Sequence, residues 1–386
     1  MSLGHAPSIV RDGLVFYVDA SNTQKSFKGK PTTNLQLPNI IDWSGTAYVT
    51  LLPELSPINT PVYAVTDDVT GTYLARSRSL TVPNDSSTYT YSIYVKKTYG
   101  GTSAMLGFNY GIVGGTAVQY NSRLNSDTGS GATDMGTWWR WPFQAVNNST
   151  GNTTLYCDFY PATGLYGGGD NAVAVGTATV SSVMIENGTY MTPFVNGTRS
   201  NTQALVDLIG GKVVTANSLT YASNNTFTFN GTTDYCTIAS ALSGGVTTPF
   251  TLSAWAKSTN VTGWQTVIGT GGTLRQIGFS GSNFYYGGNG GGGNAFLNGG
   301  AVSANTWCHL TFTFDGTTAY GYLNGVQTTG SIGSNGGTIG SNYLGSYNGG
   351  SELLNGSIGT AMIYNRAITS AENLQNFNAT RGRFGI

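Results

Sequence analysis

Residues 306–316 read TWCHLTFTFDG, and apolar side chains occupy every second position from Cys308 to Phe314. Successive side chains of an extended strand point to opposite faces, so these apolar residues share one face. A period of two over this length predicts a half-buried β-strand. The Asp315-Gly316 pair that follows predicts a tight turn, because Asx-Gly pairs supply the positive φ angles that hairpins need.

Segments on both sides of this stretch extend the β pattern. Residues 318–323 predict a second strand that ends at Asn324-Gly325, and a third strand begins at Val326, which together form a meander. Four upstream segments alternate in the same way between turn-forming residues, with no helical period: 89–97, 137–145, 153–160 and 172–185. The sequence therefore predicts an all-β fold built from β-sandwiches.

The composition is that of a globular protein with little charge. Only 9% of the 386 residues are charged, and 56 are glycine. No apolar run approaches the roughly 20 residues needed to cross a bilayer, so we expect no membrane insertion. The 17 basic and 17 acidic residues balance without a Lys/Arg cluster, which argues against nucleic-acid binding. Near-zero net charge lowers the solubility of a free monomer, so we expect an assembly, such as a homo-oligomer.

Cysteine and histidine usage argues against disulfides and zinc. The three cysteines, Cys157, Cys236 and Cys308, each lie in a strand-like run without a Cys-x-x-Cys motif, and we expect them to be buried apolar side chains. The two histidines, His5 and His309, are far apart, and we expect mid-strand His309 to be structural. The opening residues, MSLGHAP, have neither a basic segment nor an apolar core, so we expect no signal peptide.

Three segments in the middle of the chain carry a first resemblance. They read SIYVK at 92–96, GTWWR at 136–140 and VMIENGTYMTPF at 183–194. They resemble a carbohydrate-binding-module-like jelly roll that is common in phage tail proteins. In that family a Gly-x-Trp-x-Arg segment precedes a central strand, and the closing strand ends in Glu, a small residue and a Thr-Pro-aromatic exit.

The last block of the chain carries a second set of motifs: FTLSAWAK at 250–257, the stretch 306–316, YLNG at 322–325 and LNGSIGTAMIYNRA at 354–367. These motifs resemble the concanavalin A-like (laminin-G-like) jelly roll of phage structural proteins. The Thr-Ser-Ala-Glu run that follows predicts a capping box that opens a short helix over about 370–377.

The same resemblance accounts for the N-terminal residues, because DGLVFYVDA at 12–20 looks like the first strand of that C-terminal jelly roll. We therefore predict a nested arrangement. Residues 8–33 and 198–386 form one sandwich, and residues 38–196 form a second sandwich inserted in an early loop. The rival interpretation is an N-terminal arm that docks on a neighbouring subunit.

The family of the second resemblance includes glucanases, which carry two carboxylates two residues apart on one strand face. The acids of residues 203–386 are widely separated: Asp207, Asp234, Asp315, Glu352 and Glu372. Without a strand-borne pair, a glycoside hydrolase is disfavoured, and we expect the chain not to be an enzyme.

A metal site has one set of candidates. A structural Ca²⁺ held by Asp67, Asp68 or Asp170 with backbone carbonyls is one interpretation, although no Asp-x-Asp-x-Asp-Gly loop occurs. The other interpretation is a solvated turn before Gly71. We otherwise expect no cofactor.

Aromatic residues supply the candidate binding sites. Sugars stack on flat aromatic faces while polar side chains fix their hydroxyl groups. Trp138 and Arg140 share one strand face in the Trp-rich stretch 138–141 and form one candidate carbohydrate site. A second candidate set flanks the Gly-rich run 287–294: Trp264, Arg275, Tyr285, Tyr286 and Asn294. Packing within the sandwiches is the alternative for both sets.

The two resemblances imply a function. We expect a bacteriophage protein of the virion surface, a head decoration, neck or tail appendage, whose lectin-like domains adhere to host or environmental glycans. Its partners would be other virion proteins, capsid or tail, and copies of itself. The alternative is a purely structural cement protein with the same folds and no ligand.

Overall fold

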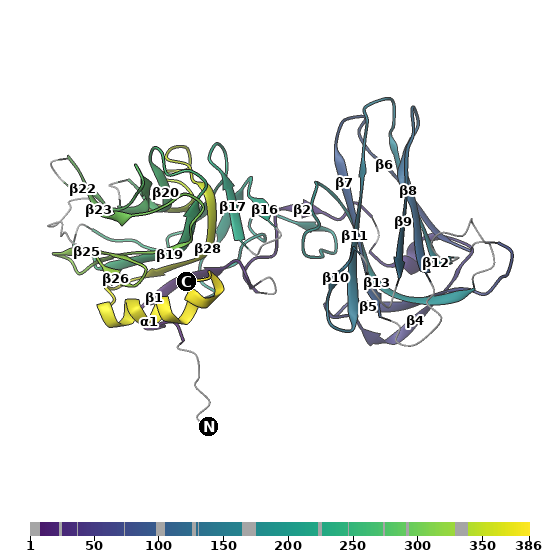
Figure 1. Cartoon of the computed structure of the whole chain (residues 1–386), viewed down its shortest axis with the longest axis horizontal. Helices are drawn as coiled ribbons and strands as arrows, with labels where there is room; N and C mark the ends of the chain where they lie inside the picture. Colours follow the sequence, from purple (N-terminus) through teal and green to yellow (C-terminus); the bar gives the residue numbers. More distant parts are fainter. Residues whose placement is uncertain are drawn as a thin grey trace, which may run out of the picture. The chain divides into compact units, whose positions relative to one another are not determined.

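The computed structural model describes residues 8–22, 25–36, 38–72, 74–97, 105–125, 129, 131–163, 175–222, 226–245, 247–272, 275–290, 293–328 and 339–386. Within these residues the chain is all-β with a single α-helix near the C-terminus, which confirms the predicted fold class (Figure 1). The chain forms two compact units: unit 1 is Met1–Pro31 with Arg199–Ile386, and unit 2 is Thr32–Thr198. No described helix is long and apolar enough to span a membrane.

Two sheets build unit 1. The larger has the order β16 (Thr220–Ala222), β17 (Thr226–Asn230), β28 (Asn355–Tyr364), β19 (Phe250–Ser258), β24 (Cys308–Phe314), β25 (Ala319–Leu323) and β26 (Val326–Gln327), and β1 (Leu14–Asp19) also pairs with β28. The smaller has the order β15 (Val214–Asn217), β18 (Tyr235–Ile238), β27 (Ile339–Leu344), β20 (Gln265–Gly272), β21 (Arg275–Ser280), β22 (Asn283–Gly290) and β23 (Gly293–Ala301). Apolar side chains of both sheets form one core.

The stretch that reads TWCHLTFTFDG forms β24, and the structure corrects one expectation about it. Every residue of β24 is buried, so both faces of this strand are covered. Cys308, Leu310 and Phe312 face the core. His309 on the other face lies under helix α1 (Ser370–Thr380), because its ring packs on Phe377 of that helix. The strand is therefore central to the unit rather than half-buried.

Helix α1 begins as its sequence predicts and ends later than expected. The Thr369 hydroxyl accepts a hydrogen bond from the Glu372 amide, and the Glu372 carboxylate accepts one from the Thr369 amide. This capping box satisfies two backbone donors at the helix start. The helix then runs to Thr380 and is followed by the short helix η2 (Arg381–Arg383).

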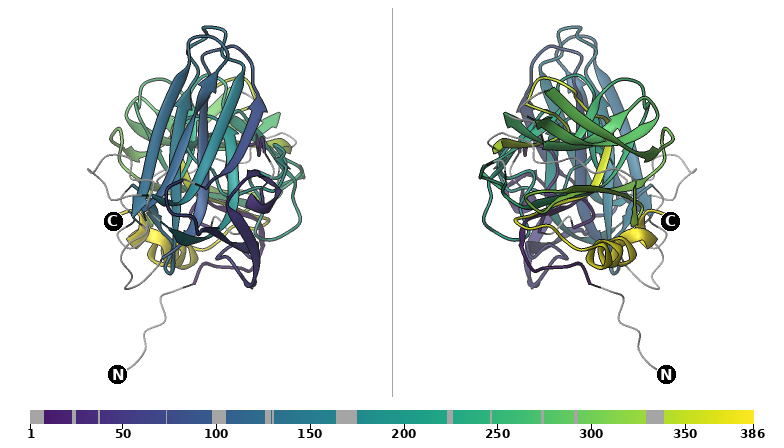
Figure 2. Two further views of the ribbon diagram at one scale, coloured as in Figure 1. Left: turned by 90° about the vertical axis from the view of Figure 1, so that its right-hand side faces the viewer. Right: turned by 90° about the vertical axis from the view of Figure 1, so that its left-hand side faces the viewer.

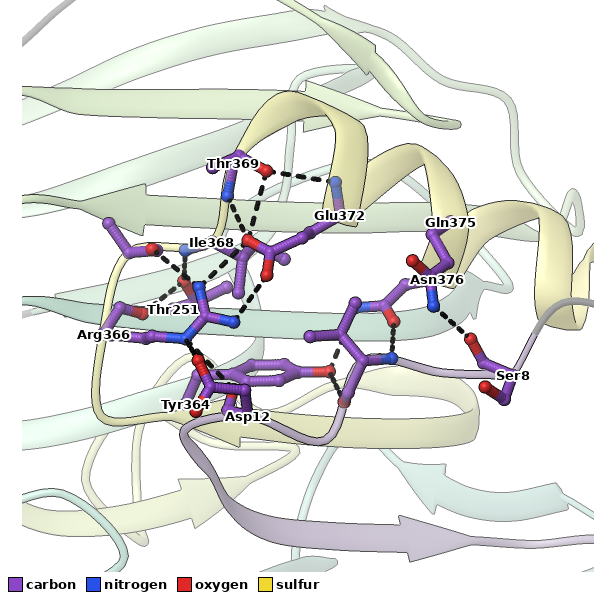
Figure 3. A network of polar contacts seen from close by, with 12 residues as sticks. Ser8, Asp12, Thr251, Tyr364, Arg366, Ile368, Thr369, Glu372, Gln375 and Asn376 are labelled. Carbon is purple, nitrogen blue, oxygen red and sulfur yellow. Dashed lines mark hydrogen bonds and ion pairs between the residues drawn. The ribbon is translucent and has the colours of Figure 1, made fainter.

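Residues 14–19 lie in the larger sheet of unit 1. β1 pairs antiparallel with β28 from Leu14 opposite Tyr364 to Asp19 opposite Thr360. Polar contacts also join residues that precede β1 to residues that follow β28 (Figure 3). The Val10 amide donates to Asn376 Oδ1 over 2.8 Å, and the Arg366 guanidinium lies 2.9 Å from Asp12 and 2.6 Å from Glu372, measured N to O.

Unit 2 is a second sandwich, whose blue strands run side by side in the left view of Figure 2. One sheet has the order β10 (Thr133–Asp134), β11 (Trp138–Val146), β7 (Thr88–Lys96), β13 (Gly176–Asn187), β5 (Pro61–Asp67) and β4 (Tyr48–Leu55). The other has the order β3 (Ser44–Gly45), β6 (Arg76–Thr81), β12 (Thr154–Thr163), β8 (Met105–Val113) and β9 (Val118–Asn125). The core between them is rich in aromatic rings, among them Phe108 and Phe143, whose ring centroids lie 4.5 Å apart.

Candidate functional site

A cluster of aromatic and polar side chains lies on the smaller sheet of unit 1, on the face turned away from the core. We call it the Trp264 cluster, and it consists of Trp264, Thr266, Gln276, Tyr285, Phe296 and Glu352. Alternation along β22 places Tyr285 on this outer face, because its neighbours Phe284 and Tyr286 belong to the core. The cluster thus depends on the same period of two that builds the sandwich.

The Glu352 carboxylate is the polar centre of the Trp264 cluster. Its Oε2 atom accepts hydrogen bonds from Thr266 Oγ1 over 2.8 Å, Gln276 Nε2 over 2.9 Å and the Tyr285 hydroxyl over 3.3 Å. The Thr266 amide also donates to the Glu352 carbonyl over 2.8 Å, which fastens the loop before β28 to β20. Glu352 adopts a left-handed backbone conformation with φ of 52°. Donors from three strands therefore fix this carboxylate in place.

Electrostatics keep the donor at Tyr285 protonated. Burial of its hydroxyl raises the pKa of Tyr285 well above the usual value, and the charge of Glu352 raises it further. Glu352 also raises the pKa of Tyr347, after burial as the main cause, so this second phenol lies near the same carboxylate. Both phenols remain neutral hydrogen-bond donors across the physiological pH range.

An indole ring stands exposed beside this network. Trp264 is 44% exposed, and its ring centroid lies 4.5 Å from Tyr285 and 4.9 Å from Phe296. Edge-on packing against Tyr285 and tilted packing against Phe296 hold the indole while leaving part of it open to solvent. Gly278 makes room for this packing, since a Cβ atom there would lie 2.7 Å from the Tyr285 hydroxyl oxygen. Tyr285 thus links the two groups, because the indole packs on its ring and the Glu352 carboxylate accepts from its hydroxyl.

The structure removes two predicted residues from this site. The Arg275 guanidinium is buried over the rings of Phe250 and Phe314, at 4.5 and 4.9 Å, and it donates to the Thr248 carbonyl over 3.1 Å. Burial lowers the pKa of Arg275 to about 10. Tyr286 is fully buried in the core. Both are packing residues, and their inclusion in the binding set is corrected.

Two other members of the predicted set stay at the site. Trp264 and Tyr285 contact each other in the Trp264 cluster. Asn294 lies in β23, but its side chain is outside the described residues. Sequence reasoning missed Glu352, Gln276, Thr266 and Phe296. The polar positions 266 and 276 lie in segments of strand-like composition, whereas nothing local in the sequence places Glu352 against them.

The predicted site at Trp138 and Arg140 is also corrected. Trp138 is 4% exposed and Arg140 is 7% exposed. The Arg140 guanidinium donates to the Thr192 carbonyl and, over 3.2 Å, to Ser92 Oγ. Trp138 belongs to a small apolar cluster with Val62 on this outer face of the sheet. Trp139 and Trp141 pack in the main core of unit 2. All three indoles are therefore packing residues, as the alternative interpretation had it.

The structure describes two of the three predicted calcium ligands, Asp67 and Asp68. Asp67 is buried and accepts hydrogen bonds from the amides of Val69 and Leu74, over 3.1 and 2.9 Å, whereas Asp68 is exposed. Asp170 and His5 lie outside the described residues. Among the residues that are described, no group of three or more His, Cys, Asp and Glu side chains is arranged to hold a metal ion.

His309 and the cysteines are buried. His309 Nε2 lies 3.1 Å from Ser253 Oγ, and burial lowers the pKa of His309 to about 3. Cys157, Cys236 and Cys308 are free thiols in the cores, and burial raises the pKa of Cys308 to about 11. These thiols are therefore protonated and shielded from reagents at neutral pH.

Residues 230–372 match the family model of the concanavalin A-like lectin/glucanases superfamily. No curated protein matches the sequence significantly. The structure resembles the binding domain of Paraclostridial Mosquitocidal Protein 1, with 15% identity, 45% of this chain and 49% of that chain covered, and a TM-score of 0.38. The chain thus spans about half the length of that domain.

Two further solved structures show the same level of likeness. Domain 4 of AbnA, an extracellular arabinanase from Geobacillus stearothermophilus solved with arabinotriose, is 19% identical over 46% of this chain and 92% of that chain, with a TM-score of 0.36. A mutant Trypanosoma rangeli sialidase is 14% identical over 60% and 43%, with a TM-score of 0.38. Likeness at this level says nothing about ligands. Residues 230–372 thus match a concanavalin A-like lectin/glucanase domain, and they lie within the two packed sheets of unit 1.

Proposed function

We propose that the chain is a glycan-adhesion protein that binds sugar through the Trp264 cluster of its lectin-like domain. The observation that carries this proposal is the exposed Trp264 ring, which packs on Tyr285, the residue whose hydroxyl donates to the Glu352 carboxylate. A pyranose ring presents C–H groups on its faces and hydroxyl groups at its edge. An indole face and a fixed acceptor side by side match these two kinds of surface.

Fixed geometry favours binding over a loose surface contact. Three hydrogen bonds and two ring contacts hold the acceptor and the indole before any ligand arrives. A site that is already ordered loses little conformational entropy on binding. The overall charge balance of the chain suits a neutral ligand better than a strongly ionic one.

We further propose that the cluster binds without catalysis. Hydrolysis of a glycosidic bond by the usual mechanism uses two carboxyl groups, about 5–10 Å apart. The partners of Glu352 Oε2 are two hydroxyl groups and an amide. These groups can orient a sugar but do not form the required pair of acids.

The placement on a bacteriophage virion rests on the sequence resemblances described above, and we retain it as part of the proposal. In this role the chain would contact other virion proteins and present the Trp264 cluster outward. The second candidate, a cement protein without a ligand, is favoured by one observation. Strand β4 ends its sheet in unit 2 and exposes Tyr48, Leu51 and Leu55, and such an apolar edge suits a protein partner.

A glycan-array experiment on the full chain tests the proposal. Wild-type protein should bind specific glycans, and Trp264→Ala should lose this binding, whereas Tyr190→Ala, which removes an exposed ring of unit 2, should retain it. Circular dichroism and thermal melting of each variant show whether it is folded. Equal binding by Trp264→Ala and wild type would refute the site, and no binding by folded wild type would favour the cement role.

A further inference from the structure

A hydroxyl, a carboxamide and a carboxylate meet out of contact with solvent inside the Trp264 cluster. Thr266 of β20 and Gln276 of β21 are fully buried, and Tyr285 of β22 is only 3% exposed. Glu352 reaches these side chains from the loop before β28. Exclusion of water from such a group of reactive side chains strengthens their electrostatic interactions and prevents hydrolysis.

One oxygen of the Glu352 carboxylate lies beside both atoms that an acyl transfer between its neighbours would use. Glu352 Oε2 lies 2.8 Å from Thr266 Oγ1 and 2.9 Å from Gln276 Nε2. Thr266 Oγ1 also lies 3.4 Å from Gln276 Oε1, so the hydroxyl adjoins the carboxamide. A general base must lie about 2.6–3.2 Å from the atom whose proton it takes. The same oxygen can therefore take a proton from the hydroxyl and deliver it to the amide nitrogen.

The backbone departs from regular geometry at both ends of this contact. β20 carries a bulge between Thr266 and Ile268, and bulges are frequent next to active sites because they redirect a side chain. Glu352 has a φ of 52°, a conformation that side-chain-bearing residues seldom adopt and that clusters at functional sites. The Thr266 amide donates to the Glu352 carbonyl over 2.8 Å. Backbone and side-chain contacts thus hold the hydroxyl and the carboxylate together.

We propose that Thr266 and Gln276 join in an intramolecular ester bond, with Glu352 as the catalytic base. A threonine hydroxyl is a weak nucleophile that an adjacent base activates. Here the base, the nucleophile and the leaving nitrogen belong to one hydrogen-bonded group, and no other molecule is required. The modification would occur once in each chain.

The step balances without an oxidant or a co-reactant. Glu352 Oε2 takes the proton of the Thr266 hydroxyl as Oγ1 attacks the Gln276 Cδ atom, and a C–O bond forms there. The C–N bond of the carboxamide then breaks, Nε2 receives the proton from Glu352, and one ammonia molecule leaves. Glu352 is a carboxylate before and after the reaction. The Tyr285 hydroxyl, 3.3 Å from Oε2, remains its donor.

Burial would make this bond durable. Esters hydrolyse in water, whereas both linked side chains are excluded from solvent. The bond would join two neighbouring strands, β20 and β21, of the smaller sheet in unit 1. A covalent link that closes a loop restrains the unfolded chain, as a disulfide does. The linkage would therefore strengthen the sheet that carries the Trp264 cluster.

Mass spectrometry of the full chain, after prolonged incubation at neutral pH, tests the proposal. The wild-type mass should be lower than the sequence mass by one ammonia molecule. Arg275 is the only Lys or Arg between Lys257 and Arg366, so trypsin places the two reacting residues in separate peptides, 258–275 and 276–366. In the digest of denatured wild-type protein these two peptides should be joined. Mild alkaline hydrolysis, which cleaves esters and spares peptide bonds, should separate them.

Three variants distinguish the reaction from simple hydrogen bonding. Glu352→Gln keeps the size of the side chain but cannot take the proton, so its mass should be unreduced and its two peptides separate. Thr266→Ser retains a hydroxyl and should keep the linkage, whereas Thr266→Val, which matches threonine in shape, should lose it. Thermal melting shows whether each variant is folded, and the wild-type peptides decide whether the bond exists even where a variant does not fold.

Two results would overturn the proposal: wild-type protein whose two peptides separate without alkali, and a Glu352→Gln protein whose peptides are joined. Loss of ammonia without joined peptides counts with the first, because a succinimide at an Asn-Gly pair loses the same molecule. Trp264→Ala alters none of the reacting groups and should keep the linkage. The ester and the proposed glycan binding can therefore fail independently of each other.

Discussion

Acidification should destabilise unit 1 through His309. The imidazole is fully buried between the sheet and helix α1, and its Nδ1 atom has no hydrogen-bond partner. Its ring lies beside Trp255 and Phe377, at 5.2 and 5.9 Å between centroids. A proton on this ring would place an unpaired charge among aromatic groups, and burial accordingly lowers the pKa of His309 to about 3.

The size of the effect follows from proton linkage. The unfolded histidine has a pKa of about 6.5, so between pH 6.5 and 3 the unfolded state binds more protons than the folded state. The stability from the neutral histidine is therefore complete above pH 6.5 and decreases as the pH falls. At pH 5.0, about 1.5 pH units below the pKa of the unfolded histidine, protonation stabilises the unfolded state. The free energy of unfolding falls by about 2 kcal/mol as a result.

Urea unfolding at pH 7.5 and 5.0 measures this loss. Two units should give two transitions, and the transition that His309→Gln shifts belongs to unit 1. Its free energy of unfolding should fall by about 2 kcal/mol in wild type and in a His5→Gln control, and by much less in His309→Gln. The Glu372 carboxylate interferes little, because the stability that comes from its lowered pKa is lost only as the pH falls below its unfolded pKa of about 4.5. An equal pH dependence in wild type and His309→Gln would refute the reasoning.

Three further predictions concern other buried groups. Arg140→Leu should lower the free energy of unfolding of unit 2 by at least about 2 kcal/mol, because the Thr192 carbonyl and the Ser92 hydroxyl lose their donor, and urea titration measures it. Gly278→Ala should destabilise unit 1 by about 1–3 kcal/mol in the same titration, since a Cβ would lie 2.1 Å from the Gln265 carbonyl oxygen, and it should also weaken glycan binding. Native protein should react with a thiol reagent only in denaturant, because the three cysteines are buried; labelling of the folded chain, followed by mass spectrometry, would contradict this.

Local patterns in the sequence predicted the elements of this fold well. The alternation over 308–314 gave the strand β24, and the Thr369–Glu372 spacing identified the start of α1. The burial of both faces of β24 was not predictable in this way. It depends on a helix that begins 56 residues after the strand ends, and the sequence of a strand does not report what covers its second face.

The candidate site shows the same limit. Tyr285 and Tyr286 are the same residue type in the same strand, and the sequence does not say which of them faces the core. The structure places Tyr286 in the core. Trp138 resembles an exposed binding aromatic in sequence and is covered by the segment that includes Thr192 and Phe194. Glu352 joins the site through hydrogen bonds to residues 67–86 positions earlier in the chain. Such contacts arise from the tertiary fold and leave no local pattern.

The pairing of β1 with β28 has a mechanical consequence. Leu14 faces Tyr364 at one end of this antiparallel ladder, so tension between the chain termini enters both strands at the same end and would open the ladder one pair at a time. The contacts of Ser8 with Gln375, of Val10 with Asn376 and of Asp12 with Arg366 precede the first pair, so on the N-terminal side they would bear the load before the ladder does. Residues 32–198 lie outside this load path. Force applied to the two ends of the chain would therefore separate β1 from β28 before it stretched unit 2.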